Sequence, residues 1–327
     1  PMAFTGNSNI SVTAYTAFAV AKAVSGAWST IWTENLPLLT AIEEAGTNFN
    51  TAEIKGGTVM QIPVAGDRLT TPTAGVADAN ELTPDTLSVT NGFSGASYYI
   101  AHYRAHTNYR ASEQFIAENG GLGNFLQGKA EQVVSDIRQQ WEDDAATSTV
   151  DSRTKIMGYR YALSTSNSPG GISQATDTQW QAHVKTSAGT FGLNLIDDQV
   201  DAITAEGKGM PDLILAGISG SSNMFGKIRT AIGPTAERLV NPNGKPVKYG
   251  LTGIQYLGAL VALDNKAATG EINVLSTKSW YVHLPKKPVA HEPVMIPGTD
   301  ARTQAFTLFT SLGTSDPSRN AGITGIT

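Results

Sequence analysis

The sequence predicts an α+β protein with one long helix, extended arms and an α/β region in its carboxyl half. Three observations lead to this class. Apolar residues recur at seven- and four-residue steps through 115–141, as on one face of a helix. Within 51–108, two alternating segments flank a loop rich in glycine, proline and threonine. From 191 onward, helical and strand patterns alternate along the chain.

The composition excludes several classes of protein. Of the 327 residues, 16% are charged, against about 25% in typical globular domains, and the net charge is −5. An acidic chain is not expected to be a dedicated nucleic-acid reader. The absence of cysteine excludes disulfides and cysteine-ligated zinc. No run approaches about 18 consecutive apolar residues, so no membrane-spanning helix is expected.

The first 33 residues carry a single charged side chain, Lys22, and scattered aromatic residues. Two interpretations stay open for this segment. It is either an irregular segment packed on its own domain or an extended arm that buries its aromatic side chains against other subunits. The region that follows, 34–50, includes a short helix predicted over 36–45, which Gly46 would end.

Residues 51–108 are predicted to form a long two-stranded excursion. Strand patterns cover 58–64 and 87–109, and successive residues from Tyr98 to Tyr103 are expected to face alternate sides. The connecting tip holds Asp67 and Arg68. Because an isolated hairpin is only marginally stable in water, the excursion needs another surface to lie on.

The clearest predicted element is a helix over 124–147, within a region 109–184 that becomes turn-rich after 151. At 1.5 Å per residue, this helix would be about 36 Å long. Its apolar stripe is expected to form a core, made of Leu126, Val133, Ile137 and Trp141. After 191, helices are predicted over 195–206 and 221–232, and strands over 212–216, 253–263, 272–275, 280–284 and 304–312.

The run Glu142-Asp143-Asp144 lies near the carboxyl end of the long helix, where negative charge opposes the helix dipole. A solvated helix end is the favoured interpretation. Acid–base chemistry, a calcium site and contact with a basic partner surface are the alternatives.

Two further patterns could carry chemistry. Gly217-Ile218-Ser219-Gly220-Ser221 follows a predicted strand and precedes a helix, as in a nucleophile elbow, but Ser221 stands where the last glycine belongs. A serine before a helix also serves as an N-cap, which is the favoured interpretation. His102 and His106 lie four residues apart in a predicted strand, too distant for one metal ion. We therefore predict no catalytic residue, cofactor or metal site.

The carboxyl half resembles tailed-phage major capsid proteins in a run of short segments. These segments are Asp212–Gly217, Arg229–Gly233, Ala236–Pro242, Tyr256–Gly258, Asp264-Asn265, Trp280–Leu284 and Gly298–Gln304. That family uses the Hong Kong 97-type fold, which encapsulins share. The resemblance in sequence is local, from about 191 to 320, whereas the order of elements matches over nearly all of the 327 residues.

The resemblance implies a division of the chain into the parts of that fold. Residues 1–33 resemble the N-terminal arm, and 34–50 begin the peripheral domain. Residues 51–108 resemble the E-loop, an extended hairpin that lies over a neighbouring subunit, with Asp67 and Arg68 as inter-subunit contacts at its tip. Residues 109–184 continue the peripheral domain, with 124–147 as its spine helix. Residues 185–275 resemble the axial domain, and 276–327 return to the peripheral domain.

The resemblance also implies a function without catalysis. Such a chain self-assembles into hexamers and pentamers of an icosahedral shell that encloses double-stranded DNA, bound without sequence preference. Its expected location is the virion, after assembly in the cytoplasm of a bacterial host, with portal, decoration and separate scaffolding proteins as further partners. A same-fold alternative is an encapsulin-like compartment shell, and an alternative of another class is an α/β-hydrolase-like enzyme that uses Ser219.

Two features of the sequence depart from well-known members of the family. Only 33 residues precede the predicted start of the peripheral domain, so scaffolding is expected to be a separate protein or absent. Lysine is missing from 56 to 128, so the E-loop tip cannot supply a lysine for the isopeptide cross-links that some members form. The shell is therefore expected to be held together by noncovalent contacts.

Overall fold

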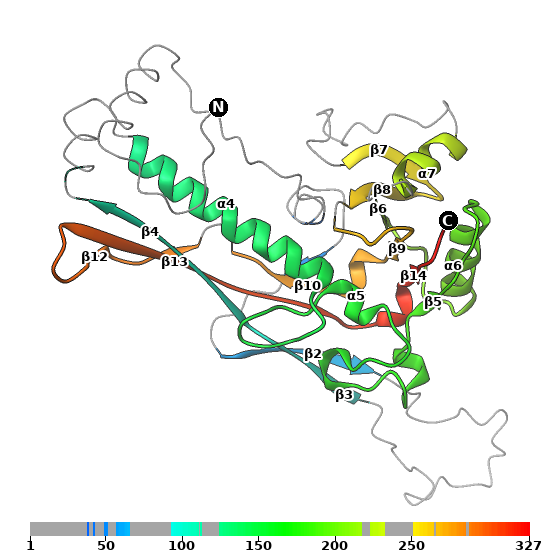
Figure 1. Cartoon of the computed structure of the whole chain (residues 1–327). Helices are drawn as coiled ribbons and strands as arrows, with labels where there is room; N and C mark the ends of the chain where they lie inside the picture. The colour runs from blue at the N-terminus through cyan, green and yellow to red at the C-terminus, as the bar shows by residue number, and fades with distance from the viewer. Residues whose placement is uncertain are drawn as a thin grey trace, which may run out of the picture. The chain divides into compact units, whose positions relative to one another are not determined.

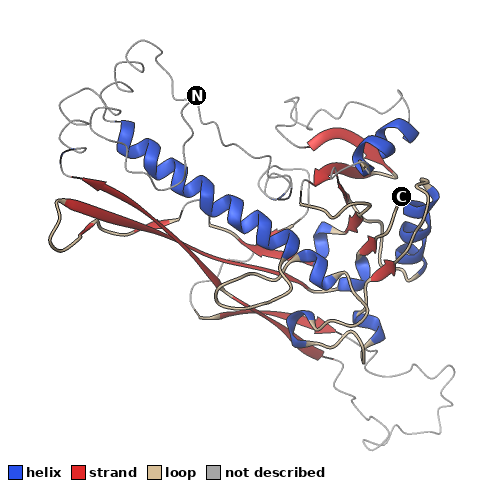
Figure 2. Cartoon of the chain, viewed as in Figure 1, coloured by secondary structure: helices blue, strands red, loops and turns tan. Residues whose placement is uncertain are grey.

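The computed structural model describes residues 38, 42, 49–51, 57–65, 93–110, 112, 124–217, 223–232, 251–264, 266–285 and 288–327. The chain divides into two compact units. Its helices and strands are labelled in Figure 1. Unit 1 comprises Pro1–Glu34, Arg104–Gln139 and Lys286–Leu308, and unit 2 comprises Asn35–Tyr103, Gln140–Pro285 and Phe309–Thr327. Helices and strands are mixed, and the described strands form three sheets (Figure 2). The predicted α+β class is confirmed.

The longest helix, α4 (Asn124–Thr147), begins and ends where the sequence predicts. It is rich in alanine, glutamine, glutamate and other good helix formers, and it contains no proline. No helix in the described part of the chain is both long enough and apolar enough to cross a bilayer. Of the short helix predicted over 36–45, Leu38 and Ile42 are helical, and its other residues lie outside the described ones.

One six-stranded sheet is organised around the long strand β13 (Ala301–Thr314). Its other strands are β1 (Asn50–Thr51), β4 (Ala101–Arg110), β10 (Trp280–His283), β11 (Val289–Ala290) and β12 (Val294–Met295). Strands β10, β11 and β12 each pair antiparallel with successive parts of β13, and β1 pairs parallel with β10. The strand predicted over 304–312 is therefore confirmed and is longer than expected.

The second six-stranded sheet lies in unit 2 and has the order β5-β14-β9-β6-β8-β7. Its strands are β5 (His183–Lys185), β6 (Leu213–Gly217), β7 (Leu251–Tyr256), β8 (Ala259–Asp264), β9 (Ile272–Leu275) and β14 (Ala321–Ile323). Helices α6 (Asn194–Ala205) and α7 (Met224–Ile232) pack with it in one apolar cluster, in which Ile203 and Ile228 meet Ile214 and Val274. This region therefore has a core of its own.

Residues 253–263, predicted as one strand, instead form the hairpin of β7 and β8. Leu257 and Gly258 connect the two strands with φ angles of 50° and 80°, as in a two-residue type I′ turn. The sequence signal for such a turn is Asn-Gly or Asp-Gly, and leucine rarely adopts a positive φ. The prediction was wrong here because the turn lacks its usual residues.

Strands β2 (Val59–Ala65) and β3 (Phe93–Tyr99) form the third, two-stranded sheet. The predicted alternation from Tyr98 to Tyr103 is wrong at Ile100, because Ile100 and Ala101 are both buried. The chain changes partner at this point: Ile100 N donates to Thr58 O, whereas β4, which follows, pairs with β13. The two-stranded part of the excursion therefore ends at Tyr99 and does not extend to 108.

Short helical elements fill the connections of unit 2. They are α5 (Tyr159–Ala162), η2 (Pro169–Gly171), η3 (Thr178–Trp180), η4 (Thr277–Ser279) and η5 (Pro317–Arg319). Two of them lie in the connections between the six-stranded sheets, because η4 joins β9 to β10 and η5 joins β13 to β14.

Candidate assembly surfaces

The β2–β3 hairpin is fixed at its base by one tyrosine of unit 2. Tyr98 is fully buried, and its hydroxyl donates to Thr314 O at 2.7 Å. Burial raises the pKa of Tyr98 well above its usual value, so the phenol stays a neutral donor. A Cβ at Gly313 would overlap the ring of Tyr98, and one at Gly170 would lie 2.7 Å from the Cβ of Ala96. Because Gly313 and Gly170 have no Cβ, Tyr98 and Ala96 can pack directly against their backbone, and this close packing positions the base of the hairpin.

The remainder of the hairpin has one buried and one exposed face. Met60, Ile62 and Val64 are buried, while Gln61 and Pro63 between them are exposed. Such alternation is typical of a strand that covers a core on one side only. The exposed face is thus the part of this hairpin that its own core does not require.

A carboxylate also holds the hairpin end. Asp151 accepts from Tyr99 N with both carboxylate oxygens, each at 3.2 Å. Desolvation by burial raises the pKa of Asp151 to about 7, and the hydrogen bond from Tyr99 N acts in the opposite direction. Its charge in the folded chain therefore changes near neutral pH.

Two of the three carboxylates at the end of α4, Glu142 and Asp144, are buried, so the expectation of a solvated helix end is wrong for them, whereas Asp143 is partly exposed. Glu142 and Asp144 are 2% and 3% exposed. Glu142 Oε1 accepts from Leu38 N at 2.8 Å, and Asp143 forms an ion pair with Lys266 at 2.7 Å. These donors compensate for the lost hydration of the charges. Among the described residues, no group of three or more metal-ligating side chains could hold an ion.

Asp144 belongs to a small buried network. It accepts from Tyr103 OH at 2.8 Å and from Gln140 Nε2 at 3.2 Å, and it lies 3.5 Å from Lys155 Nζ. Tyr103 OH in turn accepts from Ile156 N at 3.2 Å. The network joins the end of α4, strand β4 and the loop before α5, and every partner is consistent with a structural role.

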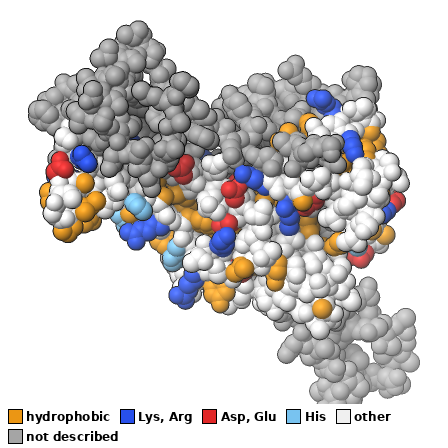
Figure 3. All heavy atoms as spheres, in the orientation of Figure 1, with side chains coloured by type: hydrophobic (Ala, Val, Ile, Leu, Met, Phe, Trp, Pro, Cys, Tyr) orange, Lys and Arg blue, Asp and Glu red, His pale blue; other side chains and the backbone are white. Residues whose placement is uncertain are grey.

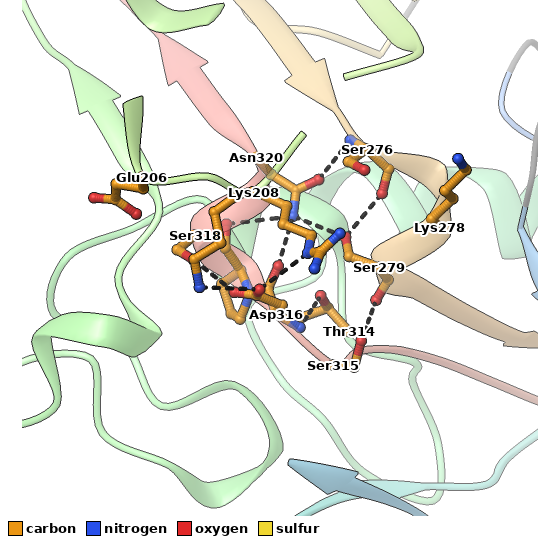
Figure 4. Close-up of polar contacts among 12 residues, drawn as sticks. Glu206, Lys208, Ser276, Lys278, Ser279, Thr314, Ser315, Asp316, Ser318 and Asn320 are labelled. Atoms are coloured by element: carbon orange, nitrogen blue, oxygen red, sulfur yellow. Dashed lines mark hydrogen bonds and ion pairs between the residues drawn. The ribbon is translucent and has the colours of Figure 1, made fainter. Parts of the chain in front are cut away.

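A second polar network ties the two connections between the sheets together (Figure 4). Asn320 is fully buried; its Oδ1 accepts from Ser276 N at 2.9 Å, and its Nδ2 donates to Ser279 Oγ at 3.1 Å. Asp316 accepts from Lys208 Nζ at 3.2 Å and from Arg319 Nε at 3.0 Å. The network thereby links the η4 and η5 connections and the loop after α6.

Exposed surface of two kinds occurs on unit 1. On β4 the exposed alternate residues are Arg104, His106, Asn108 and Arg110. Figure 3 shows basic and histidine side chains along this strand. On β11 and β12, Val289, Val294 and Met295 are 52%, 63% and 59% exposed. Exposed apolar side chains gathered on neighbouring strands are typical of a contact with another molecule.

The predicted site residues fall into two groups. Asp67, Arg68 and Ser219 lie outside the described residues, as does the side chain of Leu126. Val133 and Ile137 are 9% and 3% exposed, and Trp141 is fully buried with Nε1 donating to Thr310 Oγ1 at 2.8 Å. The basic row on β4 was not predicted, although the alternation of arginine and histidine through 102–110 is visible in the sequence.

Comparison with solved structures relates the whole chain to capsid proteins. It is similar to a chain from the capsid asymmetric unit of cyanophage A-1(L), with a TM-score of 0.64 and 12% identity over 91% of this chain and 95% of that one. A chain from the capsid of an empty GTA particle gives a TM-score of 0.62 and 10% identity over 98% and 100% of the two chains.

An encapsulin is similar as well. The holo-SrpI encapsulin complex from Synechococcus elongatus PCC 7942 gives a TM-score of 0.59 and 9% identity over 94% of each chain. No protein-family model matches the sequence, and none of the curated proteins matches it. The chain therefore has the tailed-phage capsid fold that encapsulins share, as the sequence resemblance predicted.

Proposed function

We propose that this chain is a major capsid protein that self-assembles into hexamers and pentamers of an icosahedral shell around double-stranded phage DNA. The observation that carries the proposal is the similarity of 91% of the chain to a cyanophage capsid chain and of 98% to a GTA capsid chain. The exposed apolar side chains on β11 and β12 support it, because a subunit of a shell must bury such surface against its neighbours.

The proposal assigns roles to the parts of the chain. The β2–β3 hairpin and its connection are the E-loop within 51–108, and α4 is the spine helix of the peripheral domain, 34–50 with 109–184. The α/β sheet with α6 and α7 is the axial domain, 185–275, and 276–327 return to the peripheral domain. Residues 1–33 are assigned to the N-terminal arm on the sequence resemblance alone. Contact between subunits through Asp67 and Arg68 belongs to the same proposal.

The proposed role is structural, without catalysis, and the proposed location is the virion. Strand β6 and helix α7 flank Ser219 in the order that a nucleophile elbow requires. Among the described residues, no hydrogen bond, buried side chain or polar partner supports the hydrolase alternative. DNA contact is expected to be weak and to decrease steeply with salt, because the chain has a net charge of −5.

The same fold supports a second candidate, an encapsulin-like compartment, since the encapsulin match covers 94% of the chain. The contents of particles purified from an infected or expressing host distinguish the two. A capsid is expected to protect genomic double-stranded DNA from nuclease and to release it when disrupted. Particles that instead contain a defined protein cargo and no DNA would overturn the capsid proposal in favour of the compartment.

A further inference from the structure

A cluster of polar and charged side chains lies in the interior of unit 2, apart from the surfaces described above. Its members come from α5, from the end of β8 and from the connection of β8 to β9, and they are Tyr159, Arg160, Asp264, Lys266 and Glu271. Tyr159, Asp264 and Glu271 are buried, and the side chain of Arg160 is 22% exposed. Charged groups are costly to remove from water unless they are paired and hydrogen-bonded. These five residues, the charged joint, therefore require an explanation.

Helix α5 holds both ends of the connection between β8 and β9. The Nε atom of Arg160 lies 2.9 Å from Glu271 Oε1, and its Nη2 donates to Lys266 O at 2.5 Å. The preceding residue, Tyr159, donates its hydroxyl to Asp264 Oδ2. Because Asp264 begins the connection and Glu271 ends it, two consecutive residues of α5 fix where the connection lies.

The end of α4 contacts the same connection. From Gln140 on, α4 belongs to unit 2, and Asp143 Oδ1 lies 2.7 Å from Lys266 Nζ. A Cβ at Gly158, which precedes α5, would lie 2.5 Å from Ser148 O, just after α4. The start of α5 therefore packs directly on the end of α4, and both helices are bonded to one connection of the α/β sheet.

The carboxylates of the charged joint also order the connection from within. Glu271 accepts from Ala268 N and from Asn273 Nδ2, each at 2.8 Å. Asp264 Oδ1 accepts from Lys266 N at 2.8 Å. The same two carboxylates thus bind α5 and hold the sheet's own connection, so that the orientation of one is tied to the other.

The energetics of buried ion pairs favour a role in geometry over a role in stability. Replacing such a pair with uncharged residues of similar volume is often neutral or stabilising, whereas removal of one partner alone is strongly destabilising. The donors of a guanidinium lie in one plane, so its hydrogen bonds are directional. The hydrophobic effect is not directional. A charged contact between two elements therefore selects one orientation where apolar packing alone would be less selective.

We propose that Arg160 is a positioning residue that fixes the orientation of the α/β sheet on the end of α4, through its contacts with Glu271 and Lys266. This inference rests on the proposed function and adds to it the residues that give every subunit one shape. Rings close only when successive subunits are related by a fixed rotation, so a variable orientation inside the subunit would accumulate around a ring. The charged joint would thus serve the uniformity of the shell.

The first measurement separates positioning from simple stabilisation, which is the competing explanation. Arg160→Met leaves Glu271 charged without its cation, and it is expected to lower the folding equilibrium constant of the unassembled full chain at least about hundredfold. Arg160→Met with Glu271→Gln removes both charges and retains an acceptor for Ala268 N, so its folding constant is expected to stay within about tenfold of wild type. Urea unfolding measures both constants. A double variant as unstable as Arg160→Met would overturn the proposal, because the pair would then act through stability.

The second measurement records the orientation itself. The chain contains no cysteine, so Thr147→Cys at the end of α4 and Asp201→Cys on α6, both at exposed positions, provide unique sites for spin labels. Double electron–electron resonance is expected to give one narrow distance distribution in the wild-type background. In the double variant the distribution is expected to be at least about twofold wider, because the directional contacts are lost. An unchanged distribution in the folded double variant would refute the positioning role.

An exposed ion pair provides the matched control. Lys185 on β5 and Asp198 on α6 lie 3.0 Å apart, with side chains 36% and 54% exposed. Lys185→Met with Asp198→Asn makes the same change in charge away from the charged joint. Because exposed pairs contribute little, this variant is expected to keep the stability, the distance distribution and the particles of wild type.

The consequence for assembly is measured by electron microscopy of the particles. Wild type is expected to form shells of one diameter, and the double variant shells of several diameters or open aggregates from folded subunits. Uniform shells of the double variant would overturn the role in shell uniformity while the capsid function stands. If wild type forms no oligomer, with candidate scaffold supplied, the proposed function falls, whereas the distance measurements on the subunit still decide the positioning role of Arg160.

Discussion

The α/β sheet of unit 2 and the β2–β3 hairpin use their apolar residues differently. In the sheet, residues from two helices and four strands join one cluster, in which Ile196, Ile203 and Ile228 are fully buried. The hairpin buries one face and is fixed by Tyr98 at its base, and its connecting segment, 66–92, is rich in small and polar residues. The sheet can therefore be stable by itself, whereas the hairpin needs surfaces from outside it.

This difference indicates which residues serve folding and which serve assembly. Changes in the interior should destabilise the subunit, and changes along the hairpin should have smaller effects on stability toward its tip. Three substitutions and one loop replacement test this gradient, from the largest expected effect on the free energy of unfolding to the smallest.

Trp141→Ala is expected to have the largest effect. The side chain is fully buried on α4, and its Nε1 donates to Thr310 Oγ1 at 2.8 Å. Truncating a buried tryptophan lowers the free energy of unfolding by about 3–5 kcal/mol. Urea unfolding of the unassembled subunit measures it, with Trp141→Phe as a milder control that loses the hydrogen bond and less volume. An unchanged unfolding midpoint for Trp141→Ala would mean that this face of α4 is not part of the core.

Gly313→Ala tests the anchor of the hairpin. The added Cβ would overlap the ring of Tyr98, which is buried and cannot move into solvent. Overpacking of this kind costs about 1–3 kcal/mol. Gly95→Ala on β3 is the matched control, because its Cβ would meet no atom within 4 Å. Equal stability of the two variants would contradict the close fit at Tyr98.

Asp151→Asn tests the pH dependence of the hairpin end. The folded chain raises the pKa of Asp151 from 3.8 to about 7, so between these values it binds the proton more tightly than the unfolded chain does. This residue's contribution to stability is therefore fully present below about pH 4 and is lost as the pH rises through 7. Asparagine has no such titration and still offers Tyr99 N an acceptor.

The expected readout is the difference in unfolding free energy between wild type and Asp151→Asn at several pH values. Wild type should lose stability relative to the variant as the pH rises from 4 to 8. A difference that stays constant over this range would show that the carboxyl group titrates normally.

Replacing 66–80 with a short Gly-Ser turn is expected to affect subunit stability least. Shortening a loop changes its closure entropy only slightly, so the free energy of unfolding should change by less than about 1 kcal/mol. Circular dichroism should remain near native, while closed shells become rare or fragile. Normal particles would show that the tip is dispensable for assembly, and a globally unfolded chain would show that the hairpin belongs to an ordinary internal sheet.

The sequence predicted elements with strong periodicity and missed those set by contacts between distant segments. Helix α4 and strand β9 have the predicted bounds, because the apolar residues of each follow a single periodicity from beginning to end. The burial of Glu142 could not be predicted, since its donor, Leu38 N, is 104 residues away. The change of partner at Ile100 likewise depends on β13, about 200 residues further along the chain.

The candidate surfaces were predictable only in part. A long excursion at 51–108 was indicated by composition, but the end of its two-stranded part at Tyr99 follows from the pairing of β4 with β13. The basic row on β4 is a simple alternation in the sequence, yet its meaning depends on which side of the strand is exposed. That side became known only from the fold.

The most direct test of the account is the mass of the native species, measured by sedimentation velocity and verified by negative-stain electron microscopy. The account predicts that the full chain, expressed alone or with its scaffold, forms hexamers or pentamers and closed shells of many copies. A stable 34.4 kDa monomer at high concentration, with any scaffold supplied, would contradict it.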